Sequence, residues 1–167
     1  YGIGAYIAYR HDPVTAMPDA DAVKHAMDKL RLIVSIDVRY SETGWFSDVI
    51  LPESTYLERA NILAQLPGPV PVFVMRDQAI APRFDSRPAW WIFREILRRM
   101  GIKEALDFET IEEIWNYQLE GTGVTVAEMR EAGFVALAGA PKLTPREDLR
   151  FPTPSGKIEI ESGILKQ

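Results

Sequence analysis

The sequence predicts an α/β fold built on a parallel sheet. Residues 5–9 and 32–37 are short apolar runs typical of buried strands, and residues 18–30 between them carry apolar side chains at helical spacing. A strand, a helix and a strand within about 35 residues form a unit whose strands are expected to be parallel, with a right-handed crossover. The second strand ends at Asp37, and open α/β sheets bind nucleotides at the carboxyl ends of their strands. The pattern therefore indicates a nucleotide-binding α/β domain.

The composition narrows the class of protein. With 167 residues and 47% hydrophobic content, the chain is long enough for one domain with a core. Its net charge of -5 argues against a general nucleic-acid binder, and no apolar run approaches the roughly 20 residues that cross a bilayer. The absence of cysteine excludes disulfides, Fe–S ligation and a cysteine nucleophile within this chain. Because the sequence starts without Met, inside an apparent strand, we expect a piece of a longer protein.

The first half of the chain continues with short elements. The first strand is followed by a turn signal at residues 10–13. Ser41 is expected to cap a short helical turn, which leads to a strand at residues 48–51. A proline-rich loop at residues 67–71 precedes a further strand at residues 72–75.

The second half is predicted to be mainly helical. A helix over residues 89–100 should place an apolar stripe on the core and end at Gly101. Two more helices start at the capping-box pattern Thr-x-x-Glu, from Thr110 and from Thr125, and Gly133 ends the second of them.

The chain is expected to divide into two unequal parts. Residues 1–137 would form the α/β domain. Residues 138–167 begin with a stretch rich in Pro, Gly, Ala and charge, which indicates a linker, and continue into a new strand at residues 158–160. The sequence contains no internal repeat.

Asp37 and Arg59 are the first candidates for binding residues. The Asp37 carboxylate could accept hydrogen bonds from N1 and N2 of guanine or from ribose hydroxyls, or it could merely cap the following turn, and both alternatives stay open. Arg59 could stack on a base or hold a phosphate with its planar fork. A surface ion pair with the neighbouring Glu58 is the commoner outcome for such residues.

No catalytic group and no metal ligand is predicted within this chain. Glu53 and Glu58 are interpreted as solvated or structural acids, because spacing alone supplies neither the converging geometry nor the split pKa values of a two-carboxylate hydrolase. His11 and His25 lie in different elements, without an acidic residue at metal-ligand spacing. The basic residues of the 89–100 helix are expected to be solvated or to dock on a neighbouring domain; they are Arg94, Arg98 and Arg99.

Three motifs in a consistent order resemble the molybdopterin oxidoreductases of the dimethyl sulfoxide reductase family. The segment DVRYSETGWFSDVILPESTYLER at residues 37–59 is similar to the family's D-x-x-x-T-E-T-x-x-x-A-D-V-V-L-P with an acid and a base shortly after it. PAWWIFREILRRMG at residues 88–101 resembles a family helix, and FPTPSGKIE at residues 151–159 resembles F-x-T-P-S-G-K-I-E, which leads towards the family's C-terminal barrel domain. The resemblance covers most of the chain.

The resemblance implies a role for individual residues. It implies a three-layer, parallel-sheet α/β domain, and this chain would be most of the third domain of the family. In the family, that domain holds the guanosine end of one molybdopterin guanine dinucleotide. Asp37 would read guanine, with Ile36 beside it, and Arg59 would make a basic contact to the dinucleotide. Asp12 stands where the family usually has Asn, and an ionised Asp only accepts hydrogen bonds whereas an Asn amide also donates them.

For the whole enzyme the resemblance implies two-electron reduction of a small anion at molybdenum or tungsten. Within the family, the sequence looks closest to thiosulfate, polysulfide and related reductases. It also implies an Fe–S cluster in an N-terminal part outside this chain. Expected partners are the remaining domains of the same polypeptide, an Fe–S electron-transfer subunit and a membrane anchor subunit, with no nucleic acid; most such relatives would be periplasmic. The alternatives are a stand-alone guanine-nucleotide or partner-binding module, and a hydratase with the same cofactor.

Overall fold

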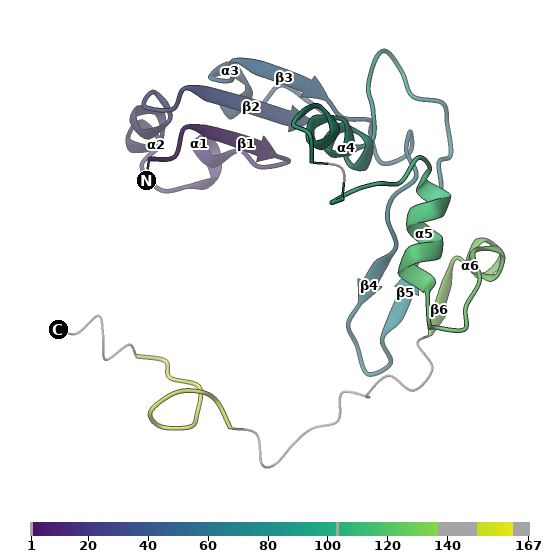
Figure 1. The fold of residues 1–167 in the computed structure, drawn as a ribbon. Coiled ribbons are helices and arrows are strands. Elements are labelled where there is room, and N and C mark those ends of the chain that lie inside the picture. Colours follow the sequence, from purple (N-terminus) through teal and green to yellow (C-terminus); the bar gives the residue numbers. More distant parts are fainter. Residues whose placement is uncertain (1, 103, 137–149, 162–167) are drawn as a thin grey trace.

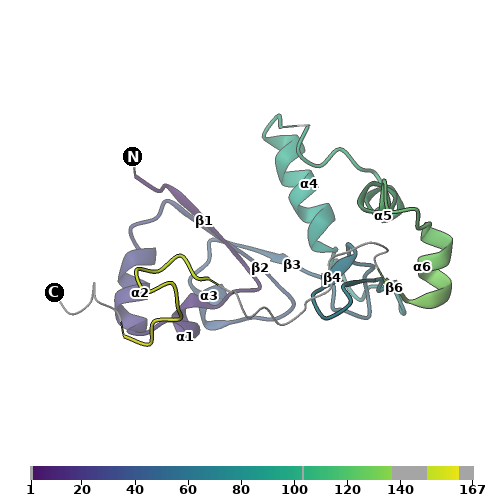
Figure 2. The same cartoon turned by 90° about the horizontal axis from the view of Figure 1, so that it is seen from below.

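The protein is described by a computed structural model that covers residues 2–102, 104–136 and 150–161. Figures 1 and 2 show two sheets in different parts of the molecule, one of order β1-β2-β3 and one of order β4-β5-β6. In chain order the described elements are β1 (Ala5–Tyr9), α1 (Pro13–Ala16), α2 (Ala20–Met27), β2 (Leu32–Asp37), α3 (Glu42–Trp45), β3 (Val49–Pro52), β4 (Ala64–Leu66), β5 (Val72–Val74), α4 (Ala89–Arg99), α5 (Ile111–Leu119), α6 (Val126–Ala132) and β6 (Phe134–Ala136).

The first sheet is parallel, which confirms the prediction from the strand–helix–strand pattern. Central strand β2 pairs with β1 up to Tyr9 opposite Ile36, and with β3 up to Asp37 opposite Pro52. Because all three strands run in the same direction, their carboxyl ends meet at one edge of the sheet. The residues that follow them are therefore neighbours in space.

Helices cover both faces of this sheet and give it three layers (Figure 1). On one face Ile33 packs against Val14 of α1 and Met27 of α2. Successive side chains of a strand point to opposite faces, so Ile36 instead contacts Ile92 of α4. Ile36 is fully buried, and burying a side chain of this size contributes about 1.5–3 kcal/mol. This packing holds the carboxyl end of β2 rigidly.

The second sheet is antiparallel, so the predicted parallel arrangement does not extend to this part of the chain. β5 pairs with β4 on one side and with β6 on the other. The two outer strands were not predicted, because each has only three residues and too few positions to show an alternating pattern. Helices α5 and α6 cover this sheet (Figure 2). They enclose a second core, whose buried residues are Leu63, Trp115, Leu119, Val126 and Met129.

The helix starts follow the predicted capping signals with one exception. At α6, Thr125 and Glu128 form a complete capping box. At α5 the Thr110 side chain accepts a hydrogen bond from the backbone N–H of Glu113 at 3.2 Å. The Glu113 carboxylate accepts from the backbone of Glu109 instead of Thr110. The predicted box at α5 is therefore only half formed.

Three other expectations need correction. The turn at residues 10–13 runs directly into α1, because Pro13 at the first helical position has the fixed φ that a helix needs. Met100 was assigned to the buried stripe of α4 but is 67% exposed, since it lies beyond the end of the helix. The expected strand at residues 158–160 is absent, and Ile160 is fully exposed.

Most of the predicted linker, together with the proposed domain boundary at residue 137, lies outside the described residues. The division into residues 1–137 and 138–167 therefore stays a prediction. Within the described ranges, no helix has both the length and the apolar character needed to span a membrane.

Candidate functional site

Charged side chains follow all three strands of the parallel sheet at its carboxyl edge. Arg10 follows β1, Asp37 ends β2 and Glu53 follows β3. Backbone hydrogen bonds hold them together: the Arg10 N–H donates to Ile36 O at 3.0 Å, and the Glu53 N–H donates to Asp37 O at 2.9 Å. This is the edge at which open α/β sheets bind their ligands.

The Glu53 side chain is completely buried at the centre of this edge. Its Oε2 accepts a hydrogen bond from Nε of Arg10 at 2.6 Å, and its Oε1 accepts another from Nη2 of the same guanidinium. Nη1 of Arg59 lies 3.2 Å from Oε1, and the Tyr9 hydroxyl donates to the same oxygen at 3.3 Å. A buried carboxylate requires such pairing to be stable. Glu53 therefore holds the side chains around it in place at this edge of the sheet.

The contacts of Glu53 shift the pKa values of its neighbours. The hydrogen bond that Arg10 donates to Glu53 raises the pKa of Arg10. Burial raises the pKa of Tyr9, and the nearby Glu53 charge adds to that effect. Burial lowers the pKa of Arg59, against the attraction of Glu53. Both guanidinium groups stay protonated because the ordinary pKa of arginine lies far above neutral pH, and the Tyr9 hydroxyl remains a neutral donor.

Arg59 does not form the surface ion pair with Glu58 that is the commoner arrangement for neighbouring acidic and basic residues. Its side chain is only 5% exposed. Besides Glu53, it donates to the backbone carbonyl of Ser54 and, from Nε, to Oδ1 of Asn61 at 2.9 Å. The expectation was wrong because the chain turns after β3 and carries the Arg59 guanidinium inward to the buried carboxylate.

Glu58 has a separate structural role in the loop after β3. Its carboxylate accepts hydrogen bonds from the backbone N–H groups of Thr55 and Arg83, each at 2.9 Å, and from the Thr55 hydroxyl at 2.8 Å. These bonds lower the pKa of Glu58. Glu53 and Glu58 are thus structural acids, which was one of the two interpretations of their spacing.

Asp12 connects the loop after β1 to helix α3. Its Oδ1 accepts from the backbone N–H of Thr43 at 3.0 Å and from the Thr43 hydroxyl at 2.6 Å, and its Oδ2 accepts from the Thr15 hydroxyl at 2.9 Å. Burial acts to raise the Asp12 pKa, but the hydrogen bonds outweigh it and the net shift is downward. Asp12 is therefore an ionised acceptor that fixes two loops at the edge of the sheet.

Asp37 and Ile36 lie where the sequence analysis expected them. Ile36 is buried under α4, and Asp37 is half-buried at the open end of the strand. Among the described residues, the donor to the Asp37 carboxylate is the backbone N–H of Val38, which contacts Oδ1 at 2.7 Å. Oδ2 is left available to a ligand, so the turn-capping and ligand-binding roles are compatible.

A cavity of about 440 Å³ opens beside Arg10. Its polar wall consists of Arg10, Arg76 and Asn61. Nδ2 of Asn61 is buried and has no hydrogen-bond partner among the described residues. The rest of the lining is apolar and aromatic; it includes Tyr9, Ile62, Ala89, Trp90, Phe93, Leu106 and Ile114.

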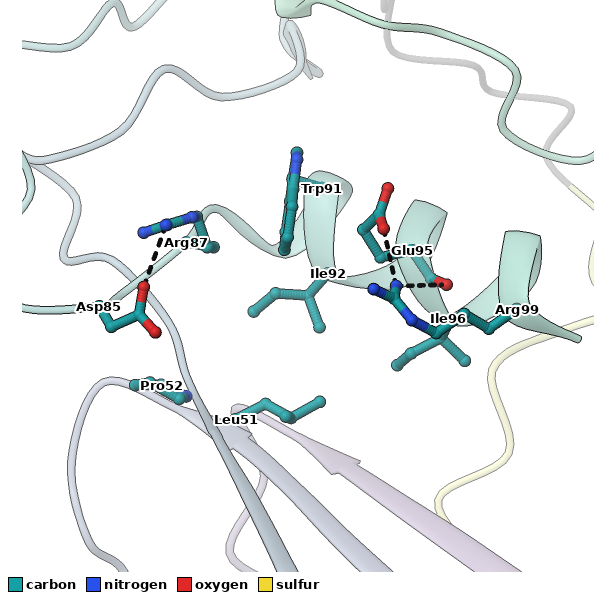
Figure 3. A pocket seen from close by; sticks show the side chains of 9 residues that line it. All are labelled: Leu51, Pro52, Asp85, Arg87, Trp91, Ile92, Glu95, Ile96 and Arg99. Carbon is teal, nitrogen blue, oxygen red and sulfur yellow. Dashed lines mark hydrogen bonds and ion pairs between the residues drawn. The ribbon is translucent and has the colours of Figure 1, made fainter.

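A second cavity, of about 420 Å³, lies between the end of β3 and helix α4 (Figure 3). Leu51, Ile92 and Ile96 line its apolar part. The charged groups at its rim neutralise each other: Arg87 lies 3.0 Å from Asp85, and Arg99 lies 2.7 Å from Glu95. Asp12, Ile36, Asp37 and Arg59 line neither cavity.

The remaining candidates have structural positions. Arg94 was expected to be solvated or to dock on a neighbouring domain, but it is buried within this chain. Its Nη1 donates to the backbone carbonyls of Phe108 and Glu109, each at 3.0 Å, which ties α4 to the loop before α5. His11 contacts the Tyr6 hydroxyl at 3.1 Å, and His25 is exposed as predicted. Among the described residues there is no group of three or more acidic or histidine side chains that could hold a metal ion.

Comparison with known proteins places this geometry in a family. A family model described as molybdopterin oxidoreductase matches residues 1–99, which include the whole parallel sheet. The chain belongs to this family. Membership implies a molybdopterin-type cofactor with molybdenum or tungsten.

Two curated relatives match the full length of this molybdopterin oxidoreductase chain. It is 30% identical to the thiosulfate reductase molybdopterin-containing subunit PhsA of Salmonella typhimurium, covering 100% of the chain and 25% of the relative. It is 23% identical to the acetylene hydratase of Syntrophotalea acetylenica, covering 100% of the chain and 23% of the relative. The chain therefore spans about a quarter of the length of these relatives.

A solved structure shares the fold. The acetylene hydratase from Pelobacter acetylenicus superimposes with a TM-score of 0.71 at 22% identity, over 99% of this chain and 23% of its own. At this identity the likeness concerns the fold, and it confirms the predicted α/β class.

Residue types alone did not reveal Arg10 or the central place of Glu53. The position of Arg10 in the sequence was a usable signal. Arg10 directly follows the first strand and Asp37 ends the second, and parallel strands bring their carboxyl ends together. Glu53 was considered only as half of an acid pair with Glu58. Its actual partners are 6 and 43 positions away along the chain, at Arg59 and Arg10.

Proposed function

We propose that this chain binds the guanosine end of a molybdopterin guanine dinucleotide within a larger oxidoreductase. The observation that carries the proposal is Asp37 at the carboxyl end of the central strand, half-buried and with Oδ2 left available by the described residues. Guanine presents two adjacent donors, N1–H and N2–H, and a carboxylate accepts both. Adenine offers no such pair of donors, so the site would select guanine.

The residues around Asp37 fit such a group. Family membership supplies the cofactor class, and the packing of Ile36 under α4 fixes the end of the strand that carries Asp37. Nδ2 of Asn61 is buried, has no partner in the part of the chain that the structure describes, and is a donor that a bound group could satisfy. Arg59 and Asp12 stay predicted contacts of the dinucleotide; here both also hold neighbouring loops through their own hydrogen bonds.

For the whole enzyme we infer reduction of a sulfur oxyanion or polysulfide. Support comes from the relative described as a thiosulfate reductase subunit, which is 30% identical to this chain, against 23% for the acetylene hydratase. The metal of the cofactor supplies the two-electron chemistry, and this chain positions one end of the cofactor. The same proposal includes an Fe–S cluster elsewhere in the polypeptide, an Fe–S electron-transfer subunit, a membrane anchor subunit and a periplasmic location. The chain alone is expected to be inactive.

The first test measures the intact mass and the metal content of the native polypeptide. We expect a chain several times longer than this one, with about one atom of molybdenum or tungsten per chain. A native chain of this size without metal would instead support the stand-alone binding module. Thiosulfate reduction by the metal-containing protein, with a reduced dye as electron donor, would separate the reductase from a hydratase.

The second test concerns guanine recognition by Asp37. In the native polypeptide, purified from a host that cannot make the pterin cofactor, guanosine should bind more tightly than inosine, which lacks the 2-amino group. Asp37→Asn should weaken guanosine binding about 10-fold and largely remove the preference over inosine, because one acceptor is replaced by a donor. Asp21→Asn, a change of the same type at an exposed position of α2, should have no effect. Unchanged guanosine selectivity in Asp37→Asn would refute the proposed role.

A further inference from the structure

We propose that Arg10 binds the diphosphate of the dinucleotide and that Glu53 positions it for this role. The inference rests on the proposed function, because it takes guanosine to lie at Asp37. Arg10 is next to Asp37 at the carboxyl edge: Tyr9 pairs with Ile36 in the sheet, and the Arg10 N–H donates to Ile36 O. A guanosine held by Asp37 would thus have its phosphates within reach of the neighbouring strand end.

The backbone of Arg10 is in an unusual conformation. Its φ of 47° lies in the left-handed region, which is sterically unfavourable for a residue other than glycine. Such a conformation persists only where surrounding contacts enforce it, and it is common at ligand-binding sites. Here the enforcing contacts are the Ile36 hydrogen bond and the two bonds to Glu53. The bend places the guanidinium 4.7 Å from the centre of the Tyr9 ring, on the wall of the 440 Å³ cavity.

The Arg10 guanidinium is only partly used by these contacts. Nε and Nη2 bind Glu53, so the described residues leave Nη1, with its two N–H donors, for a ligand. The side chain is 40% exposed, whereas that of Arg59 is 5% exposed. Of the two guanidinium groups that Glu53 holds, Arg10 is therefore the one that can meet an anion. A guanidinium held in place in advance loses less entropy on binding phosphate than a free one.

The surroundings of Arg10 carry an excess of positive charge. Arg76 lies on the same cavity wall, and it is close enough to Arg59 to lower the pKa of that guanidinium. Glu53 pairs with two of these three arginines, Arg10 and Arg59, and Asp37 is the other acid that acts on Arg10. Nδ2 of Asn61, which has no hydrogen-bond partner among the described residues, adds a further donor beside this wall. A cavity lined by donors and cations favours an anion, and a diphosphate matches the planar fork of arginine.

The cavity of Figure 3 does not offer this combination. Its two arginines, Arg87 and Arg99, each face a carboxylate on the same rim, Asp85 and Glu95. The charges of the rim sum to zero, and its floor is apolar. The diphosphate is therefore assigned to the Arg10 side of the sheet.

The test compares GDP with guanosine on the native polypeptide purified without cofactor, by calorimetric titration at low salt. Arg10→Gln should weaken GDP binding about 10-fold, because a charge-assisted hydrogen bond is lost, and leave guanosine binding unchanged. The GDP affinity of Arg10→Lys should lie between those of the unaltered protein and Arg10→Gln, since lysine keeps the charge but not the planar fork. Arg130→Gln is the matched control: Arg130 is 46% exposed and pairs with Glu112 at 2.7 Å in the other part of the molecule. It should change neither affinity.

Glu53→Gln tests the positioning role. With the anchor weakened, the ratio of GDP to guanosine affinity should fall even though residue 53 is buried away from the ligand. Thermal melting identifies any variant that fails to fold. If Glu53→Gln or Arg10→Gln does not fold, the GDP and guanosine affinities of Arg10→Lys still test the role of Arg10.

The outcomes separate the two proposals. Guanosine binding that depends on Asp37, with an unchanged GDP-to-guanosine ratio in Arg10→Gln, would overturn the role of Arg10 alone. Equal losses for GDP and guanosine would also overturn it, because the effect would then not concern the phosphates. Absence of guanosine binding that depends on Asp37 would refute the proposed function and this inference with it.

Discussion

At the scale of the residue, Glu53 organises the carboxyl edge of the parallel sheet. A carboxylate with no solvent exposure is stable only if it is fully paired, and Arg10, Arg59 and Tyr9 supply that pairing. The same contacts hold Arg10 at the cavity and Arg59 in the interior. One buried acid thus sets the orientation of residues from two segments of the chain, the end of β1 and the loop after β3.

Asp12 gives the fold a predictable response to acid. Its pKa is lowered in the folded protein, because hydrogen bonds from Thr43 and Thr15 outweigh the effect of burial. Its contribution to stability is therefore complete above the unfolded pKa of about 3.9 and is lost as the pH falls through the lower, folded value.

We expect hydrogen exchange at α1 and α3 of the native polypeptide to accelerate below about pH 4. Asp12→Asn removes the titrating group, so the same segments should be less protected at neutral pH and should show a weaker acid dependence. Asp28→Asn, at an exposed position after α2, serves as the control. An unchanged acid dependence in Asp12→Asn would show that another group is responsible.

At the scale of the element, the caps decide where helices begin. α6 has only seven residues, too few to be stable without its ends satisfied. Its complete capping box is formed by Thr125 and Glu128. α5 has the one-sided cap at Thr110 described above.

Thr125→Ala should destabilise α6 by about 1 kcal/mol, because an N-terminal N–H loses its acceptor. Hydrogen exchange of the α6 amides in the native polypeptide would measure this loss. Thr125→Ser keeps the hydroxyl and should restore most of the protection. Equal protection in the alanine and serine variants would show that packing of Val126 and Met129 alone holds the helix.

At the scale of the whole molecule, the chain contains separate cores rather than one. Two lie on the faces of the parallel sheet, around Ile33 and Ile36, and a third surrounds Trp115 under α5 and α6. The Trp115 indole donates to the carbonyl of Asn61 at 2.7 Å. Asn61 also accepts from Arg59, so the third core is joined to the candidate site through one residue.

Trp115→Ala should lower the stability of the second sheet and its helices by about 3–5 kcal/mol, since Trp115 is completely buried. Hydrogen exchange should show the loss in β4–β6, α5 and α6, while β1–β3 stay protected. Tyr117→Ala, on the exposed side of the same helix, should have little effect. Equal loss of protection in both sheets would show that the parts unfold together.

The sequence alone determined the strand–helix–strand unit, the parallel pairing and the position of Asp37, because these depend on local periodicity and on the direction of the chain. It also determined the family, through three motifs spread along the chain, each of them contiguous in the sequence. Only the tertiary structure decided the antiparallel sheet, the burial of Arg59 and Arg94, and the arrangement of Arg10 around Glu53. The physical reason is that a buried charge takes its partners from whichever segments the fold brings near it, and the 43 positions between Arg10 and Glu53 leave no local pattern.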